Sequence, residues 1–218
     1  MVSPTDVANF HAEYDRHPDD RVRLFAALVD WLPDATRVLY PGSYIDIAPS
    51  VWFDEVVYVD SDDRARRFFG QEAEVAELVM AKRAAWGPDG EETPSPTIAF
   101  HAADYTEPLP IESQSVDLLV SLFAGFVSEH CTDYLRIGGH LLVNPSHGDV
   151  AMASIDERYE LCAVVTSRTG AYQVSEHDLN NYLVPKKRQD ITVERLHESG
   201  KGIAYTRSAF AYVFERVE

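Results

Sequence analysis

Several short apolar runs of this sequence end in acids or hydroxyl-bearing residues, and the spacing of these residues suits nucleoside binding. Asp60 ends the run DEVVYVD, twenty residues after Tyr40. A turn, one crossover helix and a strand occupy such an interval, and an acid placed there can accept both hydroxyls of a ribose. Asp104 similarly ends TIAFHAAD, and Ser121 follows VDLLV. The alternatives are that Asp60 caps the next helix and that Asp104 only forms an Asx-turn.

The segment NPSHGD, residues 144–149, offers a group that could move a proton. Histidine exchanges protons near neutral pH, so His147 is the first candidate for a general base. Tyr14, Tyr172 and His177, from the two ends of the chain, are candidate neighbours in the same pocket. The alternative is that the segment is a turn that ends a strand and leaves His147 in solvent.

The apolar runs predict the elements that must position these residues. Strands are expected at 38–40, 54–60, 97–104, 116–126 and 140–145. Apolar residues at helical spacing predict helices over 19–32 and 62–85, and a further helix near 126–135. Strands that alternate with helices in this way indicate a parallel sheet covered on both faces, with the candidate residues at its carboxyl edge.

The last third of the chain has a less regular pattern. A helix-like start and a strand-like run share residues 150–168, and residues 203–217 alternate in the manner of a final antiparallel strand. The stretch SEHDLNNYL predicts a short helix capped by Ser175, with Asp178 completing a capping box.

Taken in order, these motifs resemble the class I S-adenosylmethionine-dependent methyltransferases over residues 35–150. VVYVDSDDRARRFF resembles the second motif of that family, an acid at a strand end followed by a helix. ADYTEPLPIESQSVDLLVS is similar to the run from its third strand into its fourth. YLRIGGHLLV resembles the turn before its fifth strand, with Ile137 in place of proline. Nucleotide-dependent dehydrogenases lack the last two motifs, and the sequence has no GxGxxG.

The resemblance implies an α/β, Rossmann-like, doubly wound fold. Its sheet would be mostly parallel and seven-stranded, with an antiparallel last strand and helices on both faces. One domain would span residues 1–218, with an N-terminal helical cap (1–34), a cofactor-binding core (35–150) and C-terminal strands with a substrate cap (151–218).

S-adenosylmethionine is the cofactor that the resemblance implies. Asp60 would hold its ribose, Asp104 and Tyr105 its adenine, and Ser121 its methionine portion. The full set assigned to the cofactor is Gly42, Ser43, Asp46, Asp60, Ser61, Asp104, Tyr105 and Ser121.

The first turn, VLYPGSYIDIAPS, departs from the family pattern. Tyr40 stands where the family has an acid, and Tyr44 and Asp46 stand where it has its second and third glycines; Gly42 keeps the first. Glycine is used in such turns because a Cβ would keep the backbone from the ligand. Tyr44 would therefore block the approach unless its ring points away. Asp46 either replaces the missing acid or only caps the short helix IAPSVWF.

Composition excludes several classes of function. The 218 residues include 36 acids and 19 bases, a net charge of −17 that repels a phosphate backbone and argues against a nucleic-acid substrate. The sequence has no apolar run of the ~20 residues that a membrane helix needs, and its start lacks a secretory pattern. The two cysteines lack CxxC spacing, which suits a cytoplasmic protein. The sequence contains no HExxH motif that would indicate a metal site. The oligomeric state is left open.

Two functions follow from these observations. The first is an S-adenosylmethionine-dependent methyltransferase acting on a small molecule, with His147 as general base. The second is a methyltransferase-like fold without catalysis that binds another ligand or a protein. Asp60 and Asp104 favour the first, and the altered turn favours the second. A dehydrogenase-type nucleotide binder is a weaker third option.

Overall fold

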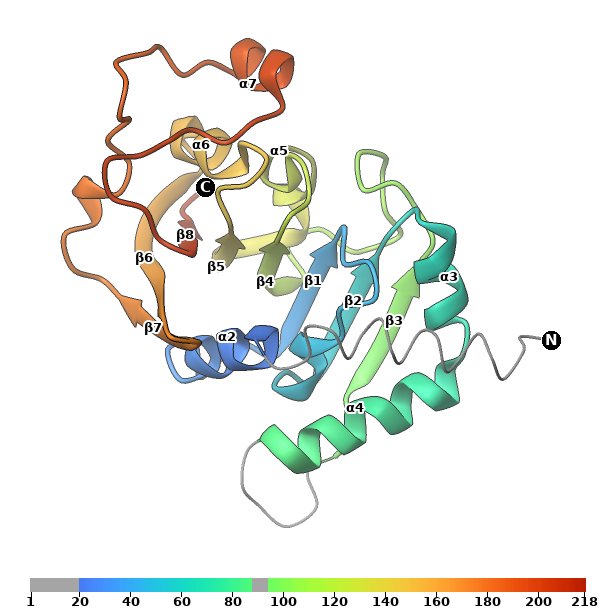
Figure 1. The fold of residues 1–218 in the computed structure, drawn as a ribbon. Helices are drawn as coiled ribbons and strands as arrows, with labels where there is room; N and C mark the ends of the chain where they lie inside the picture. The colour runs from blue at the N-terminus through green and yellow to red at the C-terminus, as the bar shows by residue number, and fades with distance from the viewer. Residues whose placement is uncertain (1–19, 88–93) are drawn as a thin grey trace.

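The computed structural model describes residues 20–87 and 94–218, and these form an eight-stranded sheet with helices on both faces (Figure 1). The strand order is β3-β2-β1-β4-β5-β8-β6-β7. The strands are β1 (Arg37–Pro41), β2 (Glu55–Val59), β3 (Thr97–His101), β4 (Val116–Ser121), β5 (Leu135–Val143), β6 (Tyr159–Arg168), β7 (Ala171–Ser175) and β8 (Ala211–Arg216). β1 to β5 are parallel, and β8 lies antiparallel between β5 and β6.

Alternate residues of the central strands pack into two separate cores, because successive side chains of a strand point to opposite faces. Val38 and Tyr40 of β1 belong to the core that contains residues of α2 (Asp20–Val29), η1 (Ala48–Val51), α3 (Asp63–Phe69) and α4 (Glu72–Trp86). Leu39 belongs to the core under α5 (Val127–Cys131) and α6 (Asp149–Ile155). The remaining short helices are η2 (Thr132–Tyr134), η3 (Leu179–Asn181) and α7 (Val193–Ser199).

The predicted fold class is confirmed, with a correction to the number of strands. The sheet has eight strands rather than seven, because β7 folds back on β6 as a hairpin and pairs antiparallel with it. The antiparallel last strand is present as β8, although it begins at Ala211 rather than near residue 203.

Two local predictions are wrong. The helix expected over 62–85 is divided into α3 and α4, because Gly70 closes the first helix with a bond from its N–H to Arg66 O. The capping box at Ser175 does not form: Ser175 ends β7, and Asp178 has a left-handed φ of 57° ahead of the single turn η3.

The described helices are short compared with a bilayer. Within residues 20–87 and 94–218, none combines the length and the apolar character needed to cross a membrane.

Candidate functional site

The strand order reverses between β1 and β4, and ligands of open parallel sheets bind beyond the carboxyl ends of the strands at such a point. Here the turn after β1 meets the loop after β4. Gly42 has a φ of +65°, and a Cβ built on it would lie 2.8 Å from the Cβ of Ala124. Gly42 is thus required by both its conformation and the close approach of the two segments.

The amides of the turn after β1 point toward the end of β2. Gly42 and Ser43 both donate their N–H groups to the carbonyl of Val59, at 2.8 and 3.4 Å. The next N–H, of Tyr44, donates to a carboxylate oxygen of Asp60 at 2.7 Å. The turn therefore satisfies three successive donors inside the fold. The Ser43 hydroxyl is buried and has no hydrogen-bond partner within the described parts of the chain.

Asp60 directly follows β2 and joins two segments. Its second carboxylate oxygen accepts the N–H of Asp62 at 2.8 Å. The N-cap of α3 is Asp62, whose side chain accepts from Arg64 N, so Asp60 is not the cap itself. Each carboxylate oxygen has a further lone pair, so Asp60 can still accept hydroxyl donors. Ser61, beside it, is exposed.

Tyr44 adopts a left-handed conformation, with φ at 49°. Its ring lies 4.9 Å from the guanidinium carbon of Arg64, on α3. The ring is thus directed toward that helix.

Asp46 is already engaged with two other side chains. Arg21 of α2 approaches it at 2.5 Å and also donates to the hydroxyl of Tyr40 at 3.0 Å. Tyr40 donates to the same carboxylate at 3.2 Å. Burial, followed by the charge of Asp46, raises the pKa of Tyr40 well above its usual range and keeps the phenol protonated. The other oxygen of Asp46 accepts from Ala48 N at the start of η1.

Asp104 and Tyr105 follow β3. Asp104 accepts the N–H and the hydroxyl of Thr106, at 3.0 and 2.8 Å, and these bonds lower its pKa. It therefore forms the Asx-turn that the sequence left as the alternative. The hydroxyl of Tyr105 accepts the N–H of Gly125 at 3.0 Å and so links the loops after β3 and β4.

Ser121 leads to a buried acid that sequence reasoning had not selected. Its hydroxyl donates to Asp149 at 2.5 Å, and Ser128 donates to the same carboxylate through its N–H and its hydroxyl. Burial raises the pKa of Asp149 to about 6. Asp149 lies in the NPSHGD segment, but only the packing of α5 against α6 shows that it is buried.

His147 is exposed, and its Nδ1 lies 2.8 Å from the hydroxyl of Ser146. That hydroxyl donates to Oδ1 of Asn144 at 2.8 Å. The C-terminal segment contacts the turn, because Gly202 N donates to Ser146 O.

The residues proposed as pocket neighbours of His147 belong to other parts of the chain. Tyr172 is in β7, at the far edge of the sheet, with its ring against Phe210. His177 follows β7 and is exposed. Tyr14 is outside the described residues.

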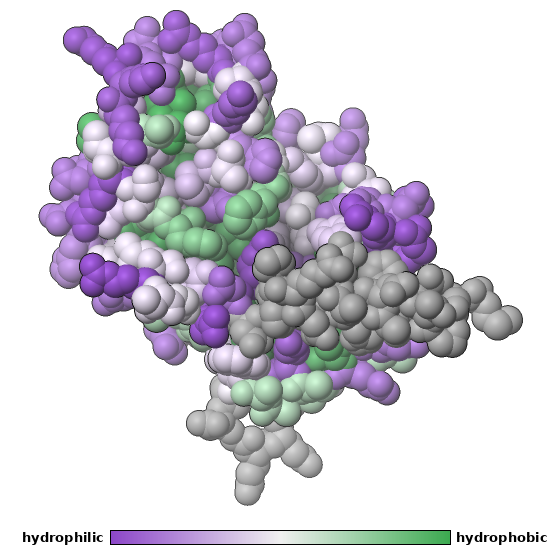
Figure 2. All heavy atoms as spheres, viewed as in Figure 1, coloured by the Kyte–Doolittle hydropathy of each residue, from purple (hydrophilic) through white to green (hydrophobic). Residues whose placement is uncertain are grey.

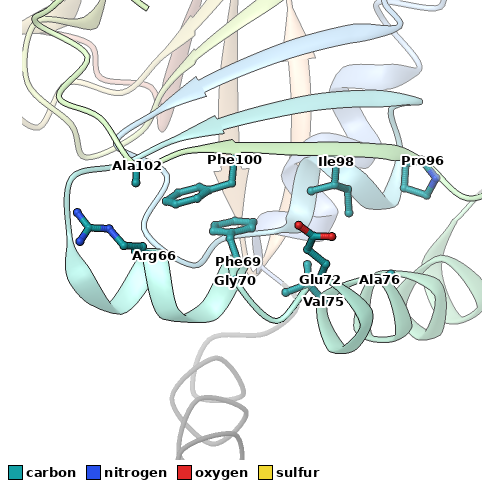
Figure 3. Close-up of a pocket in the computed structure, with 10 residues that line it drawn as sticks. All are labelled: Arg66, Phe69, Gly70, Glu72, Val75, Ala76, Pro96, Ile98, Phe100 and Ala102. Atoms are coloured by element: carbon teal, nitrogen blue, oxygen red, sulfur yellow. The ribbon is translucent and has the colours of Figure 1, made fainter. Parts of the chain in front are cut away.

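A cavity of about 440 Å³ opens at the other edge of the sheet, between β3 and the junction of α3 and α4 (Figure 3). The rings of Phe69 and Phe100 stack there with their centroids 4.6 Å apart, and the side chain of Glu72 points from the start of α4 toward β3. None of the predicted site residues lines it. Viewed as in Figure 1, hydrophobic surface lies at the centre of the molecule, above α2 (Figure 2). Among the residues that the structure describes, no group of three His, Cys, Asp or Glu could hold a metal ion.

Comparisons with known proteins give structural neighbours only. No family model matches the chain, and no curated protein sequence matches it. Most of the similar solved structures are S-adenosylmethionine-dependent methyltransferases. One, from Thiobacillus denitrificans in complex with S-adenosyl-L-homocysteine, has 20% identity and a TM-score of 0.41, over 58% of this chain and 48% of its own.

Two further neighbours have different activities. The tRNA methyltransferase TrmI from Aquifex aeolicus has 12% identity and a TM-score of 0.44, over 90% of this chain and 68% of its own. The [4+2]-cyclase SpnF has 13% identity and a TM-score of 0.39, over 57% of this chain and 44% of its own. This chain thus spans less than half the length of SpnF and of the Thiobacillus enzyme. The Rossmann-like, doubly wound fold that the resemblance implies is confirmed by the strand order of the chain itself.

Proposed function

We propose that the protein is an S-adenosylmethionine-dependent methyltransferase that acts on a small molecule. The observation that carries the proposal is Asp60 at the carboxyl end of β2, beside the switch point between β1 and β4. Its carboxylate keeps lone pairs for two ribose hydroxyls, and the buried Ser43 hydroxyl of the adjoining turn has no partner among the described residues. The cofactor, when bound, supplies an electrophilic methyl group.

In this proposal the loops after β3 and β4 enclose the rest of the cofactor. Tyr105 and Gly125 hold these loops together, and Ser121 is fixed by the buried Asp149. In this proposal Asp46 acts on the cofactor only indirectly, because its carboxylate is paired with Arg21. It therefore holds the turn and α2 together beside the cofactor's amino-acid tail.

His147 would accept the proton of the methyl acceptor. The only hydroxyl hydrogen of Ser146 is donated to Asn144, so the oxygen accepts from Nδ1–H of His147. This tautomer leaves Nε2 unprotonated and able to act as a base. Residues 151–218 would supply the cap over this turn, since Gly202 N bonds to Ser146 O and His197 bonds to Glu129 of α5 at 2.7 Å.

The net charge supports a small acceptor rather than a nucleic acid. Acids exceed bases by 36 to 19, and a field of that sign opposes the approach of a polyphosphate chain.

A second candidate, a methyltransferase-like fold that binds a ligand without catalysis, is favoured by the turn after β1. Its three amides are satisfied by Val59 and Asp60 rather than directed at a ligand. The contact of Gly42 with Ala124 also narrows the space between the two segments.

Calorimetric titration with S-adenosylmethionine and S-adenosylhomocysteine tests the proposal. We expect binding to the wild type and a loss of about tenfold to hundredfold in Asp60→Asn, the size of a hydrogen bond to a charged group. Asp62→Asn is the matched control, since it removes a neighbouring charge and keeps a good N-cap. No heat at millimolar ligand would contradict the proposal. Binding without transfer to any small acceptor would favour the second candidate.

A further inference from the structure

Phe123 follows β4 at the switch point and combines two unusual properties. Its φ is +60°, a region that bulky L-residues rarely adopt, and its side chain is 51% exposed. Burial of an apolar ring therefore does not explain the strained backbone. Such outliers persist where surrounding structure imposes them, and they gather at binding sites.

A buried amide is hydrogen-bonded to the backbone of Phe123. Asn144, at the end of β5, is 4% exposed, and its Oδ1 accepts the N–H of Phe123 at 3.1 Å. The same oxygen accepts the hydroxyl of Ser146, the partner of His147. The backbone of Phe123 is thus fixed by the group that also orients the candidate base.

The Phe123 ring lies beside the side chain of Arg21. The guanidinium carbon of Arg21 lies 5.1 Å from the ring centroid, and Asp46 and Tyr40 hold that guanidinium in place. The ring is therefore supported by a fixed cation while half of the side chain remains in solvent. This arrangement presents a rigid aromatic surface to a ligand at the carboxyl edge of the sheet.

Five non-glycine residues of the described chain have positive φ. Tyr44 contacts Arg64, Thr169 precedes Gly170 in the β6–β7 turn, and Asp178 precedes η3. Gln114, in the loop before β4, donates its N–H to Asp133 O. Among these five, Phe123 is the large apolar residue that is mainly exposed.

We propose that Phe123 is a stacking residue for the methyl acceptor, and that the acceptor is a planar aromatic small molecule. The inference rests on the proposed methyltransferase function and specifies its substrate class. An aromatic ring gains from an offset or edge-to-face contact with phenylalanine beyond the area that it buries. The acceptor ring would lie between Phe123 and the NPSHGD turn, within reach of His147.

The test measures ligand-observed NMR binding of 2-naphthol, with cyclohexanol as a non-planar probe, in the presence of S-adenosylhomocysteine. The variants are Phe123→Leu, Phe123→Gly and the control Gln114→Gly. We expect 2-naphthol to bind the wild type, and to bind both Phe123 variants about 3- to 10-fold more weakly. Cyclohexanol binding should be weak and equal in all four proteins.

Thermal unfolding provides an independent readout. Glycine removes the left-handed strain, so both glycine variants should melt higher by about 2–4 °C. We expect Phe123→Gly to be more stable and to bind 2-naphthol more weakly, whereas Gln114→Gly should be more stable with unchanged binding. Unchanged 2-naphthol binding in Phe123→Leu, or no binding to the wild type at millimolar concentration, would overturn the inference. Failure of S-adenosylhomocysteine to bind the wild type would instead count against the proposed function.

Discussion

Asp60 has a structural role that bears on every experiment at this residue. Its two oxygens accept the N–H groups of Tyr44 and Asp62. We predict that Asp60→Ala lowers the free energy of unfolding by about 1–3 kcal/mol, because partly buried amides lose their acceptor. Urea denaturation measures the change. Asp104→Ala is the control, since that Asx-turn is exposed and its loss should cost less than ~1 kcal/mol. Equal losses in the two variants would contradict this role of Asp60.

Asp149 makes stability depend on pH. Burial raises its pKa to about 6 from the ordinary 3.8, so the folded state holds a proton that the unfolded chain has released. Its contribution to stability is full below about pH 4 and is lost as pH rises through about 6, with a total on the order of 3 kcal/mol.

The variant Asp149→Asn cannot lose a proton. We predict that the free energy of unfolding of this variant, relative to wild type, increases between about pH 4 and about pH 7. Urea denaturation at several pH values measures the difference, and subtracting the wild type removes the effect of other titrating groups. A difference that is constant across that range would show that the folded state does not raise the pKa of Asp149.

At the scale of elements, the central strands and their order along the chain were predictable, because β1, β2 and β4 are almost entirely buried and their apolar runs are continuous. The division into α3 and α4 was not, since Gly70 and Gln71 interrupt the helix without interrupting the apolar spacing. The β6–β7 hairpin was also missed. Its pairing is a tertiary property, and the local signal at Ser175 favoured a capping box that the hairpin displaced.

The sequence predicted where the candidate residues lie along the chain, but not which groups they contact. The positions of Asp60, Asp104 and Ser121 at strand ends follow from the apolar pattern. Their partners come from distant segments: Tyr44 reaches Asp60 and Asp149 reaches Ser121. Arg21 had no signal in the sequence, because its pairing with Asp46 depends on how α2 packs.

Gly202 determines how the C-terminal segment seats on the turn after β5. A Cβ built on Gly202 would lie 1.8 Å from Pro145 O, so we predict that Gly202→Ala destabilises the fold by about 1–3 kcal/mol through overpacking. Limited proteolysis should show faster cleavage within residues 176–210. Gly200→Ala is the control: Gly200 has a φ of +54° and no atom within 4 Å of a Cβ, so only about 1 kcal/mol of backbone strain is expected. A loss in Gly202→Ala no larger than this would contradict the close contact.

At the scale of the whole molecule, the charge imbalance sets how the protein responds to salt. Exposed ion pairs such as Arg23–Asp20 and Arg66–Asp63 contribute only about 0–1 kcal/mol each, and salt weakens them. Salt also screens the repulsion among the 36 acids, because the 19 bases can neutralise only some of these charges. Because acids outnumber bases, we expect the screening of repulsion among the acids to change stability more than the weakening of the ion pairs does.

We therefore predict that sodium chloride stabilises the protein. The Debye length falls from about 30 Å at 0.01 M to about 10 Å at 0.1 M, so most of the gain should occur over that interval. A rise in melting temperature of about 2–4 °C corresponds to about 1 kcal/mol for a chain of this size. Glucose at matched osmolality is the control, since it leaves the charges unscreened. A melting temperature that falls with added chloride would mean that the ion pairs contribute more than the repulsion costs, and that the excess acids lie too far apart to destabilise the fold.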